Sequence, residues 1–208
     1  MPSKNSVQFN SGNFYHVYNR GNNRENIFYT DENYSYFLRK FDEYLSGYLD
    51  VFAYCLLPNH FHFLARVREM EKDLAGLQNL QGLSPTNRNP VSQAFSNFLN
   101  AYSKALNKQQ NRTGSLFQRN LKRRLIDDQG YLIRIIYYIH LNSVHHRMRR
   151  QFEDYPWSSY HCFLAQRPTI LRRNEVLSWF GGKDEFIGYH KSALAHLQEL
   201  ERYLIEDD

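Results

Sequence analysis

The sequence contains only two cysteines, Cys55 and Cys162, which lie far apart. This number and spacing exclude a disulfide framework and the cysteine pattern of a zinc finger. No stretch approaches the roughly 20 consecutive apolar residues that a membrane-spanning helix needs. The opening segment MPSKNSVQFN also lacks the apolar core of a signal peptide. These absences predict a protein that works in the reducing cytoplasm and does not enter a membrane.

Aromatic and basic side chains, by contrast, are abundant. The chain has 208 residues, of which 16 are Tyr, 15 are Phe and 42% are hydrophobic, so we expect a folded domain with a sizeable core. The formal net charge is +5 and is uneven, because residues 112–150 hold nine Lys or Arg against two Asp or Glu. This basic segment indicates a polyanionic partner such as nucleic acid, although a solvated basic face explains the charge equally well.

Hydrophobic periodicity predicts an α+β fold, with helices packed on a central antiparallel sheet. The expected order is strand, helix, strand, strand, helix, strand, helix. Strands are expected at 13–20, 49–57 and 60–67, and a short extended segment at 115–126. Helices are expected at 31–46, from Pro90 through Leu106, at about 129–142, at 174–180 and at 184–205. Residues 69–90 read as a loop excursion, and the segment that begins at Asp154 reads as an aromatic loop.

The stretch LPNHFHFLA places two histidines on a predicted strand. Side chains alternate between the faces of a strand, so His60 and His62 share one face with Arg66, whereas the phenylalanines face the core. The imidazoles are then expected about 6–7 Å apart, close enough to bind one metal ion. The alternative is a pair of histidines on a half-exposed sheet face that bind no metal, which would have the same spacing. A catalytic metal therefore needs a third protein ligand from elsewhere in the chain.

The helix expected at about 129–142 carries a tyrosine and an asparagine one turn apart. In DQGYLIRIIYYIHLNSV, Tyr138 and Asn142 form an i, i+4 pair on one face. The neighbouring Tyr137 aligns instead with an apolar stripe and is expected in the core. Tyr138 is thus expected beside a polar partner, although packing alone would also account for one tyrosine among 16.

Taken together, these motifs resemble the single-tyrosine HUH transposases, and within them the REP-associated tyrosine transposases and their insertion-sequence relatives. The resemblance covers roughly residues 13–164 and is carried, in order, by YHVYNRGNNRENIF, LPNHFHFL, FLNAYSKALNKQQNRTGSLFQ, YYIHLNSV and DYPWSSY. The family usually has proline where this chain has Ser143. That difference affects the end of the helix and leaves Asn142 intact. We therefore expect a catalytic domain in residues 1–164 and a C-terminal helical extension of unknown role in residues 165–208.

The resemblance implies an HUH nuclease fold of the ferredoxin or RRM-like type. It also implies a transposase, that is, a metal-dependent endonuclease and strand transferase that cleaves single-stranded DNA near hairpins. Tyr138 would be the nucleophile that forms a 5′-phosphotyrosine intermediate. His60, His62 and Asn142 would bind Mg²⁺ or Mn²⁺. Two imidazoles and an amide oxygen hold such an ion less tightly than a carboxylate cage does, so it should exchange readily.

The same resemblance implies a set of DNA contacts. The basic residues expected to bind backbone phosphates are Arg119, Lys122, Arg123, Arg124, Arg147, Arg149 and Arg150. Asn19 and Arg20, on a strand expected to neighbour the histidines, are further DNA contacts. Family members are commonly homodimers, in some of which the tyrosine helix serves the partner's histidines, whereas in others a monomer suffices. The sequence leaves both states open.

Three other functions stay open at this point. A non-catalytic regulator derived from a transposase would bind DNA hairpins without needing the histidines, Tyr138 and Asn142 together. A nickase of the replication-initiator type would share the chemistry but serve a different task. A hydrolytic metalloenzyme, in which Tyr138 is incidental, would release free 5′-phosphate ends and form no protein–DNA adduct.

Overall fold

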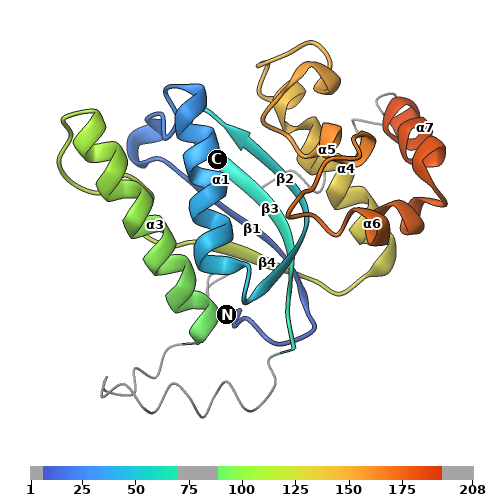
Figure 1. The fold of residues 1–208 in the computed structure, drawn as a ribbon, viewed down its shortest axis with the longest axis horizontal. Coiled ribbons are helices and arrows are strands. Elements are labelled where there is room, and N and C mark those ends of the chain that lie inside the picture. Colours follow the sequence, from blue (N-terminus) through green and yellow to red (C-terminus); the bar gives the residue numbers. More distant parts are fainter. Residues whose placement is uncertain (1–6, 70–88, 194–208) are drawn as a thin grey trace.

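The computed structural model describes residues 7–69 and 89–193, and its elements follow the expected order (Figure 1). The strands are β1 (Phe14–Arg20), β2 (Leu49–Leu57), β3 (His60–Val67) and β4 (Lys122–Ile126). The helices are α1 (Asp31–Leu45), α3 (Pro90–Gln109), α4 (Gln129–His145), α5 (Tyr160–Leu164), α6 (Arg173–Phe180) and α7 (Lys183–Ala193), with short 3-10 helices η1 (Asn22–Arg24) and η3 (Phe152–Asp154). Most of the expected loop excursion at 69–90 and the last part of the expected helix at 184–205 lie outside the described residues.

The four strands form one antiparallel sheet in the order β2-β3-β1-β4. β2 and β3 are consecutive and pair directly, with Leu57 opposite His60. β1 inserts between β3 and β4, with Tyr18 opposite both His62 of β3 and Lys122 of β4. The expected α+β class, with helices on a central antiparallel sheet, is confirmed.

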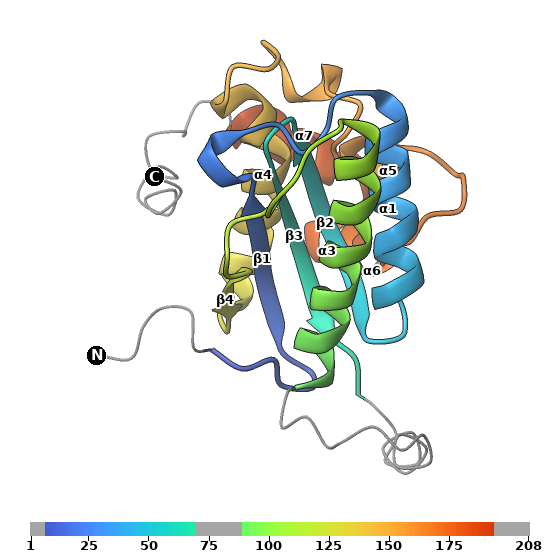
Figure 2. The same ribbon diagram turned by 90° about the vertical axis from the view of Figure 1, so that its left-hand side faces the viewer.

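Helices cover the sheet on both faces (Figures 1 and 2). On one face α1 packs against β3, with Phe37 against Phe61 at a ring-centroid distance of 5.2 Å and Phe41 against Phe63 at 4.2 Å. Each such buried ring contributes about 1.5–3 kcal/mol through the hydrophobic effect. On the other face α4 packs against β2 and β3. The alternation expected for β3 is therefore confirmed, because its phenylalanines face α1 and its histidines face the α4 side.

The helix starts follow the capping signals of the sequence. Thr30 and Asn33 form a capping box at the start of α1. At the start of α3, the side chain of Asn89 accepts a hydrogen bond from the backbone of Val91 at 3.1 Å, with Pro90 as the first helical residue. In the part of the chain that the structure describes, no helix combines the length and hydrophobicity needed to cross a membrane.

Several boundaries differ from those expected. The extended segment expected at 115–126 is a strand only over Lys122–Ile126, and α3 continues to Gln109. α4 continues to His145 rather than ending at about residue 142. Ser143 explains the extension, because it supplies the backbone N–H that a proline would lack and so does not end the helix. The aromatic segment after Asp154 is not wholly a loop, since it contains the short helix α5. Its aromatic side chains pack inward, and this tertiary packing outweighs the turn signals of the local sequence.

A chain of hydrogen bonds between buried histidines joins α4 to α7. Nδ1 of His190 donates to the carbonyl of Phe186 at 2.8 Å, so its Nε2 accepts from Nδ1 of His140 at 2.9 Å. Nε2 of His140 then accepts from the hydroxyl of Ser159 at 2.8 Å, and that oxygen accepts in turn from the backbone N–H of Tyr54 in β2. This order of donors requires both rings to be neutral. It ties α4 to α7 and to an edge strand of the sheet.

We expect His190→Ala to lower the free energy of unfolding by about 2–4 kcal/mol, because it leaves the Nδ1–H of His140 unpaired in the interior and opens a cavity. Urea unfolding at neutral pH measures the change. The matched variant is His145→Ala, which removes an exposed histidine at the end of α4 and should stay within about 0.5 kcal/mol of wild type. If both variants lose the same free energy of unfolding, the hydrogen bonds between the buried histidines add nothing to stability.

Candidate functional site

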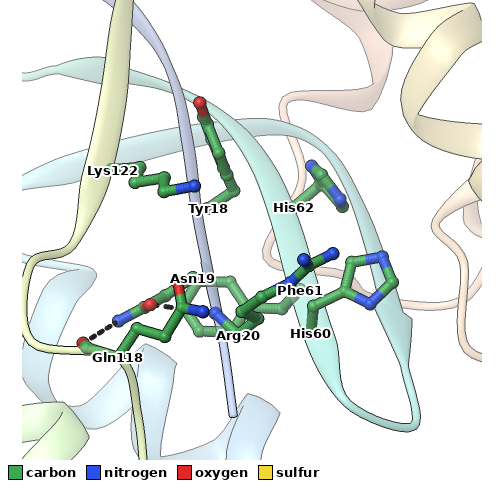
Figure 3. Close-up of a pocket in the computed structure, with 8 residues that line it drawn as sticks. All are labelled: Tyr18, Asn19, Arg20, His60, Phe61, His62, Gln118 and Lys122. Atoms are coloured by element: carbon green, nitrogen blue, oxygen red, sulfur yellow. Dashed lines mark hydrogen bonds between the residues drawn. The ribbon is translucent and has the colours of Figure 1, made fainter. Parts of the chain in front are cut away.

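The two histidines of β3 line a small pocket next to β1 (Figure 3). Strand pairing brings the neighbouring groups to them, because β1 runs antiparallel to β3 with Tyr18 opposite His62 and Arg20 opposite His60. Residues opposite each other on paired strands project from the same face. The other lining residues are Asn19, Phe61, Gln118 and Lys122. The pair is buried, since His60 is 4% exposed and His62 0%, so the alternative of two histidines on a half-exposed face does not hold.

His60 has one imidazole nitrogen without a hydrogen-bond partner. Its Nδ1 donates to Oδ1 of Asn59 at 2.6 Å, and the amide nitrogen of Asn59 donates to the carbonyl of Arg24 at 3.3 Å. The remaining nitrogen, Nε2, therefore carries the lone pair, and it is buried with no partner among the described residues. Burial, together with the nearby charges of His146 and Arg20, lowers the pKa of His60 to about 3. At neutral pH this side chain is the neutral imidazole that binds metals.

His62 is oriented by a third histidine, His16 of β1. Nδ1 of His62 and Nε2 of His16 share a hydrogen bond of 2.9 Å, and the two rings stack with centroids 5.1 Å apart. With the shared proton on His62, its Nε2 carries the lone pair and His16 holds the ring in place. Burial lowers the pKa of His62 well below its ordinary value, and burial followed by the charge of Arg124 lowers that of His16 to about 3.

Helix α4 brings three side chains over the histidine pair. The ring of Tyr138 lies edge to face with that of His62, with centroids 6.0 Å apart. Two turns further along, His146 contacts His60 at a ring-centroid distance of 4.4 Å. Asn142 is one turn from each of these helix residues, so it lies on the same face of α4 between the two contacts. Tyr138, singled out in the sequence, therefore meets the histidine pair of the same chain, and Asn142 lies on the helix face between the contacts of Tyr138 and His146.

Asn142 is fully buried and presents its amide oxygen without a partner. Its Nδ2 donates to the carbonyl of Tyr138 at 3.0 Å, which fixes the orientation of the amide. Oδ1 is buried, with no hydrogen-bond partner among the residues described. An unsatisfied buried carbonyl costs about 1–3 kcal/mol, and a cation bound to it would remove that cost.

The donor set of the site fits Mg²⁺ or Mn²⁺. Two neutral imidazoles and an amide oxygen supply three ligands and leave positions open for water and phosphate oxygens, as a catalytic metal requires. Within residues 7–69 and 89–193, no group of three or more His, Cys, Asp or Glu side chains is arranged to hold a metal. A metal bound by this histidine pair would take Asn142 as a third ligand in this donor set.

The sequence motifs do not identify two further histidines of the site, His16 and His146. His16 is two residues before Tyr18, so strand alternation alone would have placed it on the face of the histidine pair once β1 was known to pair with β3. His146 is four residues after Asn142, and it shares that helix face only because α4 continues through Ser143. Burial, followed by the charges of His145 and Arg20, lowers the pKa of His146 to about 4.

Some of the basic residues expected to contact DNA lie on the same face as the histidine pair. Arg20 is opposite His60 in the sheet, and its charge contributes to the lowered pKa of three histidines of the site. Lys122 is opposite Tyr18, and its Nζ lies 5.6 Å from the centre of that ring. Arg124 projects from the same face of β4, over the ring of Tyr131. These cations surround the pocket with positive charge.

Two of the expected DNA contacts face the opposite side of the sheet. Arg123 packs over the ring of Phe9 at 4.6 Å, and its Nε donates to the carbonyl of Val7. Asn19 is 3% exposed, and its Nδ2 donates to the carbonyl of Gln118 at 3.2 Å. The remaining expected contacts, Arg119, Arg147, Arg149 and Arg150, are exposed.

Six buried or partly buried histidines make the protein sensitive to acid. Burial lowers the pKa of each: His16, His60, His62, His140, His146 and His190. Unfolding returns these groups to about 6.5, so below that pH the unfolded chain binds more protons than the folded one. Stability that is complete above pH 6.5 should therefore fall between about pH 6.5 and pH 4.

Urea unfolding midpoints at pH 7.5, 5.5 and 4.5 test this expectation and should decrease in that order. Carboxylates ordinarily titrate near pH 4, below most of this range, so the histidines dominate the change. A midpoint that stays constant from pH 7.5 to pH 4.5 would contradict the neutral, buried state of these rings.

Comparisons with known proteins bear on the fold. No protein-family model matches the chain, and no curated protein matches it. Among solved structures, a similar chain is the REP-associated tyrosine transposase bound to a REP hairpin. The two chains share 16% sequence identity and a TM-score of 0.56, over 78% of this chain and 86% of the other. This likeness shows that the protein has the fold of that transposase, a four-stranded antiparallel sheet covered by helices.

Proposed function

We propose that this protein is a single-tyrosine HUH transposase related to the REP-associated tyrosine transposases. In this proposal it is a metal-dependent endonuclease and strand transferase that acts on single-stranded DNA near hairpins. The observation that carries the proposal is the contact of Tyr138 with His62 of the same chain, with Asn142 one helical turn away and hydrogen-bonded to the carbonyl of Tyr138. The fold of a transposase bound to a DNA hairpin supports DNA as the substrate.

The geometry of α4 positions the reacting groups. His60, His62 and Asn142 would hold Mg²⁺ or Mn²⁺, which when bound would polarise the scissile phosphate and offset the charge on its oxygens. Tyr138 is one helical turn from Asn142, so the helix itself fixes the distance between nucleophile and ligand before DNA binds. Arg20 adds a positive charge on the same face, which favours an anionic phosphate.

The chemistry is a transfer of the phosphoryl group to tyrosine and back to DNA. The hydroxyl of Tyr138 attacks the phosphorus and loses its proton to solvent or to a neighbouring neutral imidazole. The bond between phosphorus and the 3′ oxygen breaks, and that oxygen keeps the electron pair and takes a proton, which leaves a 3′-OH. The phosphotyrosine retains the energy of the phosphodiester. Attack by a second 3′-OH can then rejoin DNA without ATP.

We further propose that the attack occurs within one chain. Tyr138 and His62 of the same chain lie with ring centroids 6.0 Å apart, so a single protomer contains the whole set of groups. A homodimer in which the tyrosine serves the partner would require α4 to leave this contact and its packing on β2 and β3. Tyr138 is 8% exposed, so DNA reaches it only after a local displacement of the surrounding groups.

The low exposure of Tyr138 favours a second candidate function, a DNA-hairpin-binding regulator derived from a transposase. One experiment separates the two. Labelled single-stranded hairpins are incubated with the protein and Mn²⁺, with or without a chelator, and then denatured. The proposal predicts a metal-dependent covalent adduct and a released strand with a 3′-OH. Hairpin binding without cleavage would indicate the regulator, and cleavage to free 5′-phosphate ends without an adduct would indicate metal-dependent hydrolysis.

A further inference from the structure

A second, polar groove adjoins the histidine pocket. It is lined by α3 and by the segment 114–123. Figure 2 shows this segment returning from the end of α3 toward β4. Asn19 and Gln118 line both the groove and the histidine pocket, so the two hollows lie on either side of these two residues. A linear molecule that leaves the groove past Gln118, next to the start of β4, would pass from the α3 side of the sheet to the histidine side.

The wall formed by α3 has a regular polar stripe. Ser96, Asn100 and Lys104 follow one another at intervals of four residues and all line the groove, so they form one row along the helix. Hydroxyl and amide groups both donate and accept hydrogen bonds, which suits the edges of unpaired bases. Beneath them, Leu99 and Phe117 supply an apolar floor on which base faces can lie.

The charge of this region has one sign. Residues 89–126 contain seven Lys or Arg and no Asp or Glu, whereas a solvated protein surface usually mixes both signs. Of the cations that line the groove, Lys104 and Arg119 are exposed. Cations without competing carboxylates, next to amides and an apolar floor, match the phosphates and bases of a nucleic-acid strand.

We infer that this groove binds the single strand that continues from the cleaved bond. Its phosphates lie against Lys104 and Arg119, and its bases lie against Ser96 and Asn100. The occupant is a single strand rather than a duplex, because a duplex keeps its base faces stacked and away from the groove floor. The inference rests on the proposed function for the position of the cleaved bond. The claim that the groove binds a single strand rests on the residues that line it.

The test measures the binding of hairpins with and without a single-stranded tail. All proteins carry Tyr138→Phe, so that no chemistry interferes, and fluorescence anisotropy of the labelled DNA gives the affinities. The groove variant is Asn100→Ala with Lys104→Ala. The matched control is Asn97→Ala with Lys108→Ala, which removes the same exposed residue types from the same helix outside the groove. Melting curves verify that both variants are folded.

The groove variant should bind the tailed hairpin about tenfold more weakly than the control does. The slope of log affinity against log salt should fall by about 0.7, because one phosphate contact is lost. Binding of the tail-less hairpin should be equal in the two variants. Equal affinity of both variants for the tailed hairpin overturns the inference, and so does an equal loss for the tailed and tail-less DNA.

A separate measurement distinguishes failure of the groove inference from failure of the proposed transferase function. Adduct formation by the protein with Tyr138 intact is scored on the same tailed hairpin. If an adduct forms but the groove and control variants bind the tailed hairpin equally, the groove inference is wrong and the transferase proposal is retained. If the groove variant loses affinity only for the tailed hairpin and no adduct forms, the groove inference is supported and the transferase proposal is wrong.

Discussion

Tyr138→Phe should abolish covalent attachment of DNA, lowering the rate of adduct formation by roughly a thousandfold or more, because no other hydroxyl replaces the attacking oxygen. The measurement is a time course with a labelled single-stranded hairpin and Mn²⁺, analysed after denaturation. Binding of the uncleaved DNA should change by less than about threefold. The phenylalanine ring keeps the edge-to-face packing against His62 and His16, whose rings lie 6.0 and 5.9 Å from Tyr138.

The neighbouring residue supplies a matched control for this result. Tyr137 is also on α4, but it is fully buried on the other side of the helix, 5.4 Å from the ring of His190. Its hydroxyl has no hydrogen-bond partner among the described residues, so Tyr137→Phe removes no interaction there. Adduct formation should stay within about twofold of wild type. If both variants lose the adduct to the same extent, the loss reflects the packing of α4 rather than the chemistry of Tyr138.

His60→Ala and Asn142→Ala should each weaken Mn²⁺ binding by at least about tenfold. Each would remove one of the three proposed protein ligands, and loss of even an outer hydrogen-bond partner costs about that much. Titration of the DNA-free protein followed by electron paramagnetic resonance measures free Mn²⁺ directly. The readout does not depend on activity, so it tests the ligand set independently of the transferase proposal.

The control for metal binding is His145→Ala, in the last turn of α4. This histidine is exposed and is adjacent in sequence to His146, which packs on His60. Its removal should leave the Mn²⁺ affinity within about twofold of wild type. If His60→Ala binds Mn²⁺ as tightly as wild type does, the buried Nε2 of His60 is not a ligand and the site as described is wrong.

Much of the sheet could be predicted because it depends on local pattern. The continuous apolar run before Pro58 predicts β2, and the alternation that starts at His60 predicts β3 with its histidines on one face. Both strands and their antiparallel pairing are confirmed. The i, i+4 relation of Tyr138 and Asn142 is likewise a property of any helix through those residues. The side-chain repeats of a strand, 2 residues, and of a helix, about 3.6 residues, are sufficient to predict these features.

The remaining features depend on contacts between residues far apart in the chain. Alternation shows which residues share a face with His60 but not that α4 covers that face and buries it. It places His16 only after β1 is known to pair with β3. It also divides Lys122 and Arg123 between opposite faces, although a run of basic residues reads as one patch. The bond between His140 and His190 links segments whose proximity no local pattern encodes.

The buried donor atoms are the clearest example of information that only the structure provides. Composition and spacing select Asn142, but they do not show that its Nδ2 is held by the carbonyl of Tyr138 while its Oδ1 is left without a donor. Nor do they show that Asn59 fixes the tautomer of His60. These two constraints turn a set of residue types into a set of oriented lone pairs, which is what a metal ion requires.

The most direct test of the central claim is to identify the residue that carries DNA after the reaction. The protein is incubated with a single-stranded hairpin and Mn²⁺, the covalent adduct is isolated and digested, and the modified peptide is located by mass spectrometry. The account predicts a 5′-phosphoryl linkage on Tyr138, formed only when the metal is present. A linkage on any other residue, or DNA cleaved without any linked peptide, would contradict it.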